Sequence, residues 1–179
     1  MREGPRAGLL AAVLLLAADQ LVKWVVTGPL GIDFAGAVRE LTGFFALRFV
    51  PNVGVSLGLL PAAGHLTRWA LVGLTGAIAV AVAVWMWRER NRADQVALGL
   101  VLGGALGNIV DRVRLGYVTD YADLHFWTPW DPLWRPFLVF NLADAAITIG
   151  VLVLLVRALL MREKPGAGPK DGSVENVNA

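Results

Sequence analysis

The sequence predicts an all-α membrane protein: a bundle of four transmembrane helices with a small extracytoplasmic β element and an aromatic-rich outer loop. Two observations predict this class. The 179 residues are 56% hydrophobic and 17% charged, whereas a soluble domain has about 45–50% apolar and about 25% charged residues. The apolar residues are also gathered in four blocks, and roughly 20 residues of apolar helix cross a hydrocarbon core of about 30 Å.

The four predicted spans differ in their polar content. They cover residues 8–26, 69–87, 96–113 and 137–161. The second has no charged residue and has Trp69 and Trp87 at its ends, as is typical of aromatic residues at a membrane interface. The third is rich in Gly, which lets helices pack closely in lipid. The first and fourth carry ionisable residues within their apolar runs.

Basic residues predict the orientation of the bundle. They flank the spans on one side and are Arg2, Arg6, Arg88, Arg90, Arg92, Arg162 and Lys164. Because cytoplasmic flanks carry such an excess, both termini are expected in the cytoplasm, and residues 27–68 and 111–136 outside. An alternative for the first block is a cleavable signal peptide. Its apolar character resumes at residues 21–26, which favours a span.

The chain is expected to form one domain over residues 1–164, followed by a disordered cytoplasmic tail, 165–179, because the tail has little to bury. In the first outer segment, residues 41–50 are β-branched and aromatic, so they are expected to form a strand. The second outer segment holds Phe126, Trp127, Trp130 and Trp134. This composition is typical of a loop lying at the level of the lipid headgroups.

Composition excludes several kinds of function. The net charge is only +2, which is too small for a nucleic-acid surface. The absence of Cys excludes disulfides, thiolate nucleophiles and Cys-ligated metals. Outside the tail the only Ser is Ser56, and the chain has two His, so a serine triad has few candidates. There is no HExxH motif and no phosphate-binding loop, so neither a metal nor another cofactor is expected.

Asp19 and Lys23 lie inside the first span, where an ionisable residue is costly and is a candidate for function. They are spaced i, i+4 with the acid first, which favours an ion pair on one helix face. We interpret the pair as chiefly structural. The alternative is that Lys23 also meets a lipid phosphate or the substrate.

Asp144 lies seven residues after Phe137 in the fourth span. At 1.5 Å per residue this spacing predicts a depth of about 10 Å below the outer boundary. Asn141 and Thr148 share its helix face, so a polar stripe is expected to point into the bundle. Helix–helix hydrogen bonding is one explanation, but an amide would serve that purpose at lower cost, so a functional carboxylate is favoured.

Two carboxylates that share one proton can hydrolyse a peptide bond without Cys, metal or cofactor. The end of the third span places Asn108, Asp111 and Arg112 on one face, and Asp120 and Asp123 follow it. Asp19, Asp111, Asp120 and Asp123 all lie on the expected outer side as partners for Asp144. The neighbouring cations Lys23 and Arg112 make Asp19 and Asp111 less suitable, which leaves Asp120 or Asp123 open.

Four stretches, in this order, resemble the lipoprotein signal peptidase (signal peptidase II) family of intramembrane aspartyl proteases. They are Asp19-Gln20 with Lys23, PNVGVSLG around Asn52, GGALGNIVDR (103–112) with GYVTDY (116–121), and FNLADAAIT (140–148). The resemblance runs from the first span to the last, and the combination of motifs is specific to this family.

The resemblance implies that Asp120 and Asp144 are catalytic, and it implies further roles. The residues matching the family's substrate-binding positions are Asn52, Asn108, Arg112 and Asn141; those matching supporting positions are Asp19, Lys23 and Asp111. The implied substrate is a diacylglyceryl-modified prolipoprotein, cut just before its lipidated Cys. The enzyme would act as a monomer among membrane lipids in the bacterial inner membrane, with its site near the outer face and with no metal, cofactor or nucleic acid.

Two departures from the family pattern stand out. Val55-Ser56 replaces the expected Ala-Ala, and Thr119 replaces an apolar residue before Asp120. The Trp-rich loop of residues 121–136 is also longer than is usual for the family and is a candidate lid. Two other classes remain as alternatives: an ion-coupled transporter, which would need polar residues through the full membrane thickness, and a non-catalytic scaffold, which would tolerate Asp144→Asn.

Overall fold

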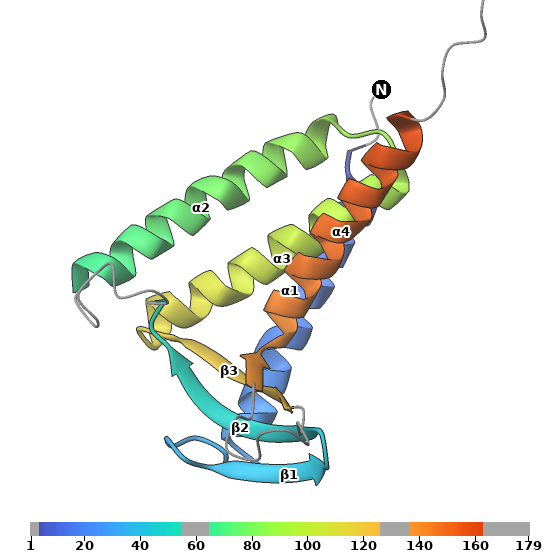
Figure 1. Ribbon diagram of the computed structural model, residues 1–179. Helices are drawn as coiled ribbons and strands as arrows, with labels where there is room; N and C mark the ends of the chain where they lie inside the picture. Colours follow the sequence, from blue (N-terminus) through green and yellow to red (C-terminus); the bar gives the residue numbers. More distant parts are fainter. Residues whose placement is uncertain (1–3, 55–64, 126–136, 163–179) are drawn as a thin grey trace, which may run out of the picture.

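Four long helices are joined to a small antiparallel sheet in the computed structural model, which describes residues 4–54, 65–125 and 137–162 (Figure 1). The helices are α1 (Arg6–Thr27), α2 (His65–Arg88), α3 (Arg92–Arg114) and α4 (Leu142–Arg162). Each is long and apolar enough to cross a membrane, which confirms the four predicted helices. The strands are β1 (Val38–Thr42), β2 (Phe45–Asn52), β3 (Val118–His125) and β4 (Phe137–Phe140), hydrogen-bonded in the order β1-β2-β3-β4.

Helix α3 is the centre of the bundle, because it packs against α1, α2 and α4. Its glycines allow this close approach. A Cβ at Gly103 would lie 2.5 Å from the carbonyl oxygen of Ala12 on α1, and one at Gly104 would lie 2.5 Å from that of Ala143 on α4. Any larger residue would therefore push the helix backbones apart.

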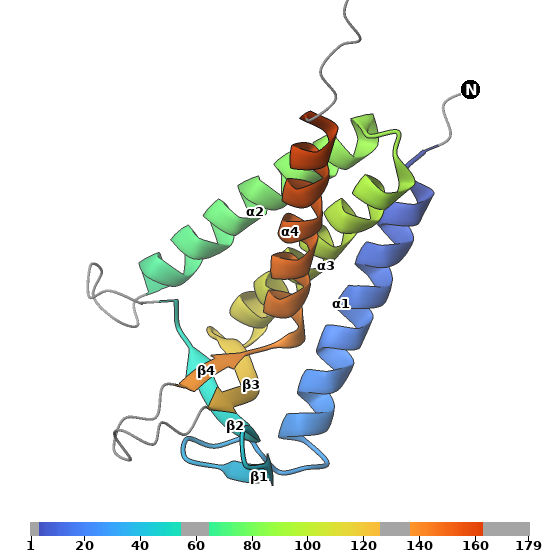
Figure 2. The ribbon, with the colours of Figure 1, turned by 45° about the vertical axis from the view of Figure 1, so that its right-hand side comes forward.

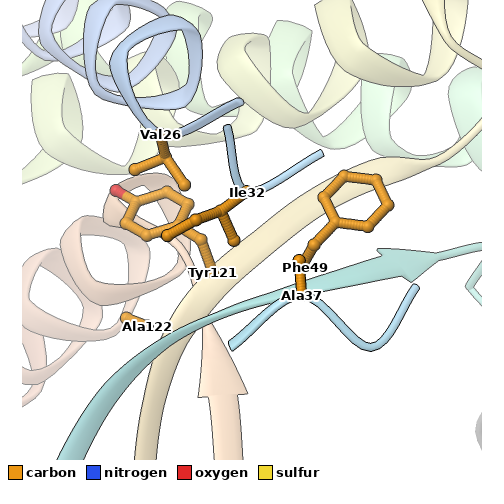
Figure 3. Packing of buried hydrophobic residues seen from close by; sticks show 6 residues of the cluster. All are labelled: Val26, Ile32, Ala37, Phe49, Tyr121 and Ala122. Atoms are coloured by element: carbon orange, nitrogen blue, oxygen red, sulfur yellow. The ribbon is translucent and has the colours of Figure 1, made fainter. Parts of the chain in front are cut away.

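The sheet lies at one end of the bundle, while the beginning of α1 and the connection between α2 and α3 lie at the other (Figures 1 and 2). A compact apolar cluster joins the sheet to the end of α1. Figure 3 shows Val26 of α1 and Ile32 of the following loop beside Tyr121 of β3, with Phe49 of β2 close by. This contact holds β3 against the bundle.

A β-bulge in β2 sets its register against β3. Leu47 pairs with Ala122 and Val50 pairs with Asp120. Two residues of β2, Arg48 and Phe49, therefore lie opposite a single residue of β3, Tyr121. Such bulges bend a strand and re-aim its side chains. Beyond the bulge Asn52 pairs with Val118, which places it diagonally across from Asp120, within reach of a side-chain contact.

The structure corrects three expectations about secondary structure. Residues 41–50 are not one strand but parts of the β1–β2 hairpin, with residues 43–44 at its turn. Residues 121–125, expected in the outer loop, belong to strand β3. Residues 137–140 form β4 rather than helix, because their backbone groups pair with β3. The fourth helix therefore begins at Leu142, and Asp144 lies in its first turn rather than about 10 Å along it.

Several sequence predictions fall outside the described residues. They concern the Val55-Ser56 departure, the aromatic residues at positions 126–134 and the tail 165–179.

Candidate active site

Asn141 and Asp144 cap the beginning of α4 reciprocally. The backbone N–H of Asp144 donates to Asn141 Oδ1 at 2.9 Å, and the backbone N–H of Asn141 donates to Asp144 Oδ2 at 3.3 Å. This is the geometry of a capping box built from Asn and Asp. It fixes the Asp144 carboxylate at a helix N-terminus, where the helix dipole favours negative charge.

Side chains from two other elements satisfy the neighbouring N–H groups of α4. The N–H of Leu142 donates to Tyr121 Oη at 3.2 Å, and the N–H of Ala143 donates to Asp19 Oδ1 at 3.0 Å. Tyr121 belongs to β3 and Asp19 to α1. The position of the Asp144 carboxylate therefore depends on the sheet and on α1 together, since the first N–H groups of a helix have no partner within it.

Asp120 is nearly fully buried on β3, and each of its carboxylate oxygens accepts a hydrogen bond from an asparagine. Asn141 Nδ2 donates to Oδ1 at 2.7 Å, and Asn52 Nδ2 donates to Oδ2 at 3.0 Å. Asn108 Nδ2 donates to Asp144 Oδ1 at 2.8 Å. Asn141 Nδ2 also donates to Asn108 Oδ1 at 3.3 Å, which completes a network of two acids and three amides.

The environment of Asp120 favours its neutral form. The pKa of Asp120 is raised to about 6: burial is the largest cause and the nearby charge of Asp144 adds to it, while the hydrogen bonds from Asn52 and Asn141 oppose the shift. A carboxyl group with a raised pKa in a cleft or at an interface is typical of a general acid. The charge of Asp144 therefore acts on Asp120, as is expected of two carboxylates that lie close enough to share a proton.

A buried ionic cluster contacts this network through Asn108. Lys23 Nζ is 2.7 Å from Asp19 Oδ2 and 2.8 Å from Asp111 Oδ2, and it donates to Asn108 Oδ1 at 3.5 Å. Asp111 Oδ2 also accepts the backbone N–H of Thr119, the residue before Asp120, at 3.1 Å. The cluster thus links α1, α3 and β3 and touches both halves of the candidate site.

These contacts confirm one expected ion pair and correct one other expectation. The Asp19–Lys23 ion pair is as the helical spacing predicts. Lys23 also pairs with Asp111 of α3, a contact that spacing along one helix does not indicate. Thr148 does not point into the bundle: it is exposed, and its hydroxyl donates to the Asp144 carbonyl oxygen one turn back.

Arg112 is half-buried and lies beside the same site. Its charge acts on Asp144, Asp120 and Asp111, and its Nη2 would lie 3.9 Å from a Cβ at Gly54, just after β2. Within the described ranges, its buried Nε has no hydrogen-bond partner. The structure therefore brings all nine candidate residues from the sequence into one region, which is built from α1, β2, α3, β3 and α4.

Sequence reasoning missed two residues of this region. Tyr121 holds the first N–H of α4, and Gln20 Nε2 donates to Asp111 Oδ1 at 2.9 Å. A strand pattern in YVTDYADLHF would have placed Tyr121 and Asp120 on opposite faces of one strand, so Tyr121 could have been assigned to the sheet–bundle contact. Gln20 belongs to the first family motif, but neither that motif nor its spacing indicated a contact with Asp111.

Known proteins of the same family match this chain along nearly its whole length. A family model described as signal peptidase (SPase) II matches residues 11–160. The lipoprotein signal peptidase of Sphingopyxis alaskensis is 51% identical over 170 residues, 95% of each chain. That of Rhizorhabdus wittichii is 56% identical over 172 residues, 96% of this chain and 92% of the relative.

Solved structures show the same relationship in three dimensions. One described as a bacterial membrane enzyme is 27% identical, with a TM-score of 0.69 over 94% of both chains. A second with the same description is 28% identical, with a TM-score of 0.68 over 85% of this chain and 92% of the other. The chain therefore belongs to the signal peptidase II family of bacterial membrane proteases.

Proposed function

We propose that the chain cleaves bacterial prolipoproteins just before their diacylglyceryl-modified Cys, with Asp120 and Asp144 as the catalytic pair. The class of reaction comes from the family, and the class of substrate comes from the relatives' name, lipoprotein signal peptidase. The observation that supports these two aspartates is that Asn141 contacts both. Its side chain donates to Asp120 and its backbone donates to Asp144.

In this proposal the pair carries one proton, and the raised pKa of Asp120 favours that residue as its holder in the free enzyme. The ionised Asp144 takes a proton from a water, whose oxygen attacks the scissile carbonyl carbon. Asp120 donates its proton to the carbonyl oxygen as negative charge develops there. The tetrahedral gem-diol then collapses: one of its hydroxyl groups returns a proton to Asp120 as the carbonyl re-forms, the C–N bond breaks, and the proton on Asp144 passes to the leaving amine.

The remaining polar residues have binding and supporting roles in the proposal. Asn52, Asn108, Arg112 and Asn141 are the candidates for holding the substrate. Asn52 and Asn141 are placed to exchange their hydrogen bonds to Asp120 for bonds to substrate carbonyl groups. The supporting residues are Asp19, Lys23 and Asp111. Their ion pairs hold Asn108 and the beginning of β3 in position.

The proposed arrangement in the membrane places both termini in the cytoplasm and the catalytic pair near the outer face. Its support is that the arginines around the α2–α3 connection lie at the end away from the sheet (Figure 1). In the proposal the protein is a single-domain monomer surrounded by membrane lipids, as the family resemblance implies.

The test is prolipoprotein processing in vesicles. Asp144→Asn is expected to insert normally but to leave the substrate uncut, whereas the control Asp33→Asn, at an exposed loop position, cuts it at the parent rate. The parent enzyme is expected to cut the diacylglyceryl-modified substrate and to spare the same chain without lipid. Normal cleavage by Asp144→Asn would remove the carboxylate from the mechanism, and equal cleavage of both substrates would remove the lipid from recognition.

A further inference from the structure

A second polar site lies at the end of the bundle opposite Asp120 and Asp144. A cleft of about 820 Å³ opens between the beginning of α1 and the connection between α2 and α3. Four arginines line it: Arg6, Arg88, Arg90 and Arg92. Arg6 belongs to the start of α1 and the other three to the continuous α2–α3 connection, and the fold brings these two segments to the same end of the bundle, as Figures 1 and 2 show.

The positive charge of this cleft is not balanced within the described part of the chain. Glu89 is the single acidic residue in its lining, and Glu89 Oε1 already accepts the backbone N–H groups of Arg90 and Asn91 at 2.7 and 2.8 Å. The nearby Asp94 is paired with Arg157 of α4. Over residues 4–54, 65–125 and 137–162, none of the four arginines forms an ion pair.

The walls of the cleft add an apolar component that faces lipid. Leu10 and Trp87 line it and are each 61% exposed. Leu10 continues one turn along α1 into the exposed Leu14, and Trp87 is one turn beyond the exposed Val84 on α2. An acyl chain could lie along these faces while its headgroup occupies the cleft, and Trp is typical of this interfacial depth.

We propose that this cleft binds the phosphate headgroup of an anionic phospholipid, in the leaflet away from the catalytic pair. Guanidinium groups form bidentate hydrogen bonds with phosphate, and clustered arginines in a concave site between membrane helices attract anionic lipids. The apolar walls favour a lipid over a soluble phosphate. The bound headgroup would join the start of α1 to the α2–α3 connection by neutralising charges that otherwise repel one another.

The experiment measures phosphatidylglycerol binding to the purified full-length protein in neutral detergent by native mass spectrometry, with phosphatidylcholine as the reference lipid. The parent is expected to prefer phosphatidylglycerol. Arg88→Gln/Arg92→Gln is expected to weaken that binding roughly 30-fold, from about 1 kcal/mol per arginine near a headgroup. The control Arg39→Gln/Arg114→Gln removes the same charge from exposed positions at the sheet end and is expected to bind as the parent does.

Two further measurements separate the possible explanations. Arg88→Lys/Arg92→Lys keeps the charge and is expected to lose less affinity than the Gln pair. Both pairs are expected to cleave substrate at the parent rate, and in phosphatidylcholine neither pair is expected to unfold below the parent temperature. Equal lipid binding by the Gln pair and the control pair would overturn the proposal. So would millimolar inorganic phosphate stabilising the parent against heat as strongly as phosphatidylglycerol, since the site would then hold a free anion.

Discussion

The side-chain amide of Asn141 donates a hydrogen bond to the carboxylate of Asp120 at 2.7 Å, so the residue that caps the start of α4 also contacts the acid on β3. The same side chain accepts the backbone N–H of Asp144 at 2.9 Å. One amide therefore couples the start of a helix to a strand 21 positions earlier in the sequence. Asn141 therefore has two roles: it stabilises the fold by capping α4, and it serves activity by donating to Asp120.

Substitutions at Asn141 are expected to separate those roles. Asn141→Ala removes the helix cap and the donor to Asp120, so we expect a loss of about 1 kcal/mol of stability and nearly all activity. Asn141→Ser restores a cap acceptor but not the donor, so stability should return while activity stays low. Unfolding midpoints and cleavage rates of the two variants check this. Recovery of activity together with stability in the Ser variant would show that capping is the residue's whole role.

The pH profile of kcat/KM is expected to report the proton on Asp120. Burial raises the pKa of Asp120 to about 6, so the protonated form that the mechanism uses is lost as the pH rises through that value. Asn52→Leu removes a hydrogen bond that lowers this pKa while keeping the volume, so the descending limb should move to higher pH. A limb that stays in place or moves to lower pH would contradict this assignment.

Lys23 is expected to contribute strongly to stability. It lies buried between Asp19 and Asp111, and Lys23→Met would leave two buried carboxylates without their cation, at a cost of about 3–5 kcal/mol. The unfolding midpoint in mixed micelles measures the loss. Arg39→Met on the exposed strand β1 is the matched control and should change little. A similar, small change in both variants would mean that the cluster contributes nothing to stability.

Gly107 and Gly73 provide a matched pair of helical glycines. A Cβ at Gly107 would lie 2.6 Å from Asp19 Oδ2, whereas one at Gly73 on α2 would have nothing within 4 Å. Gly107→Ala should therefore displace the Asp19 carboxylate and cost about 1–3 kcal/mol, with loss of activity. Gly73→Ala should keep activity and lose no stability, since Ala favours helix. The cleavage rates and unfolding midpoints of the two variants test the packing account, which fails if the two variants behave alike.

The helices could be predicted from the sequence because length and hydropathy alone decide whether a segment can span a membrane. The Asp19–Lys23 pair could be predicted because it depends on spacing along one helix. By contrast, the apolar run at residues 137–140 reads equally well as the start of a helix or as a strand. Its pairing with β3 depends on a backbone contact that no local pattern encodes, and this is why the predicted distance of Asp144 from the start of its helix was wrong.

The sequence indicated which residues form the candidate site, but not which of them contact one another. Composition and spacing left Asp120 and Asp123 as equal partners for Asp144, and the family resemblance selected Asp120. The structure separates the two acids physically. Asp120 meets Asn52 and Asn141, whereas Asp123 is paired with Arg48 at 2.6 Å. The bulge that brings Asn52 beside Asp120 and the hydroxyl of Tyr121 at α4 are long-range contacts, so sequence spacing could not reveal them.

The central claim is that Asp120 and Asp144 act as one catalytic unit. The most direct measurement is a double-mutant cycle of cleavage rates for Asp120→Asn, Asp144→Asn and the double variant on a diacylglyceryl-modified prolipoprotein. Each single variant should lose at least about 100-fold, and the double variant should be no slower than the singles, because removing either carboxylate disables the pair. Losses that multiply in the double variant, or substantial cleavage by either single variant, would contradict the account.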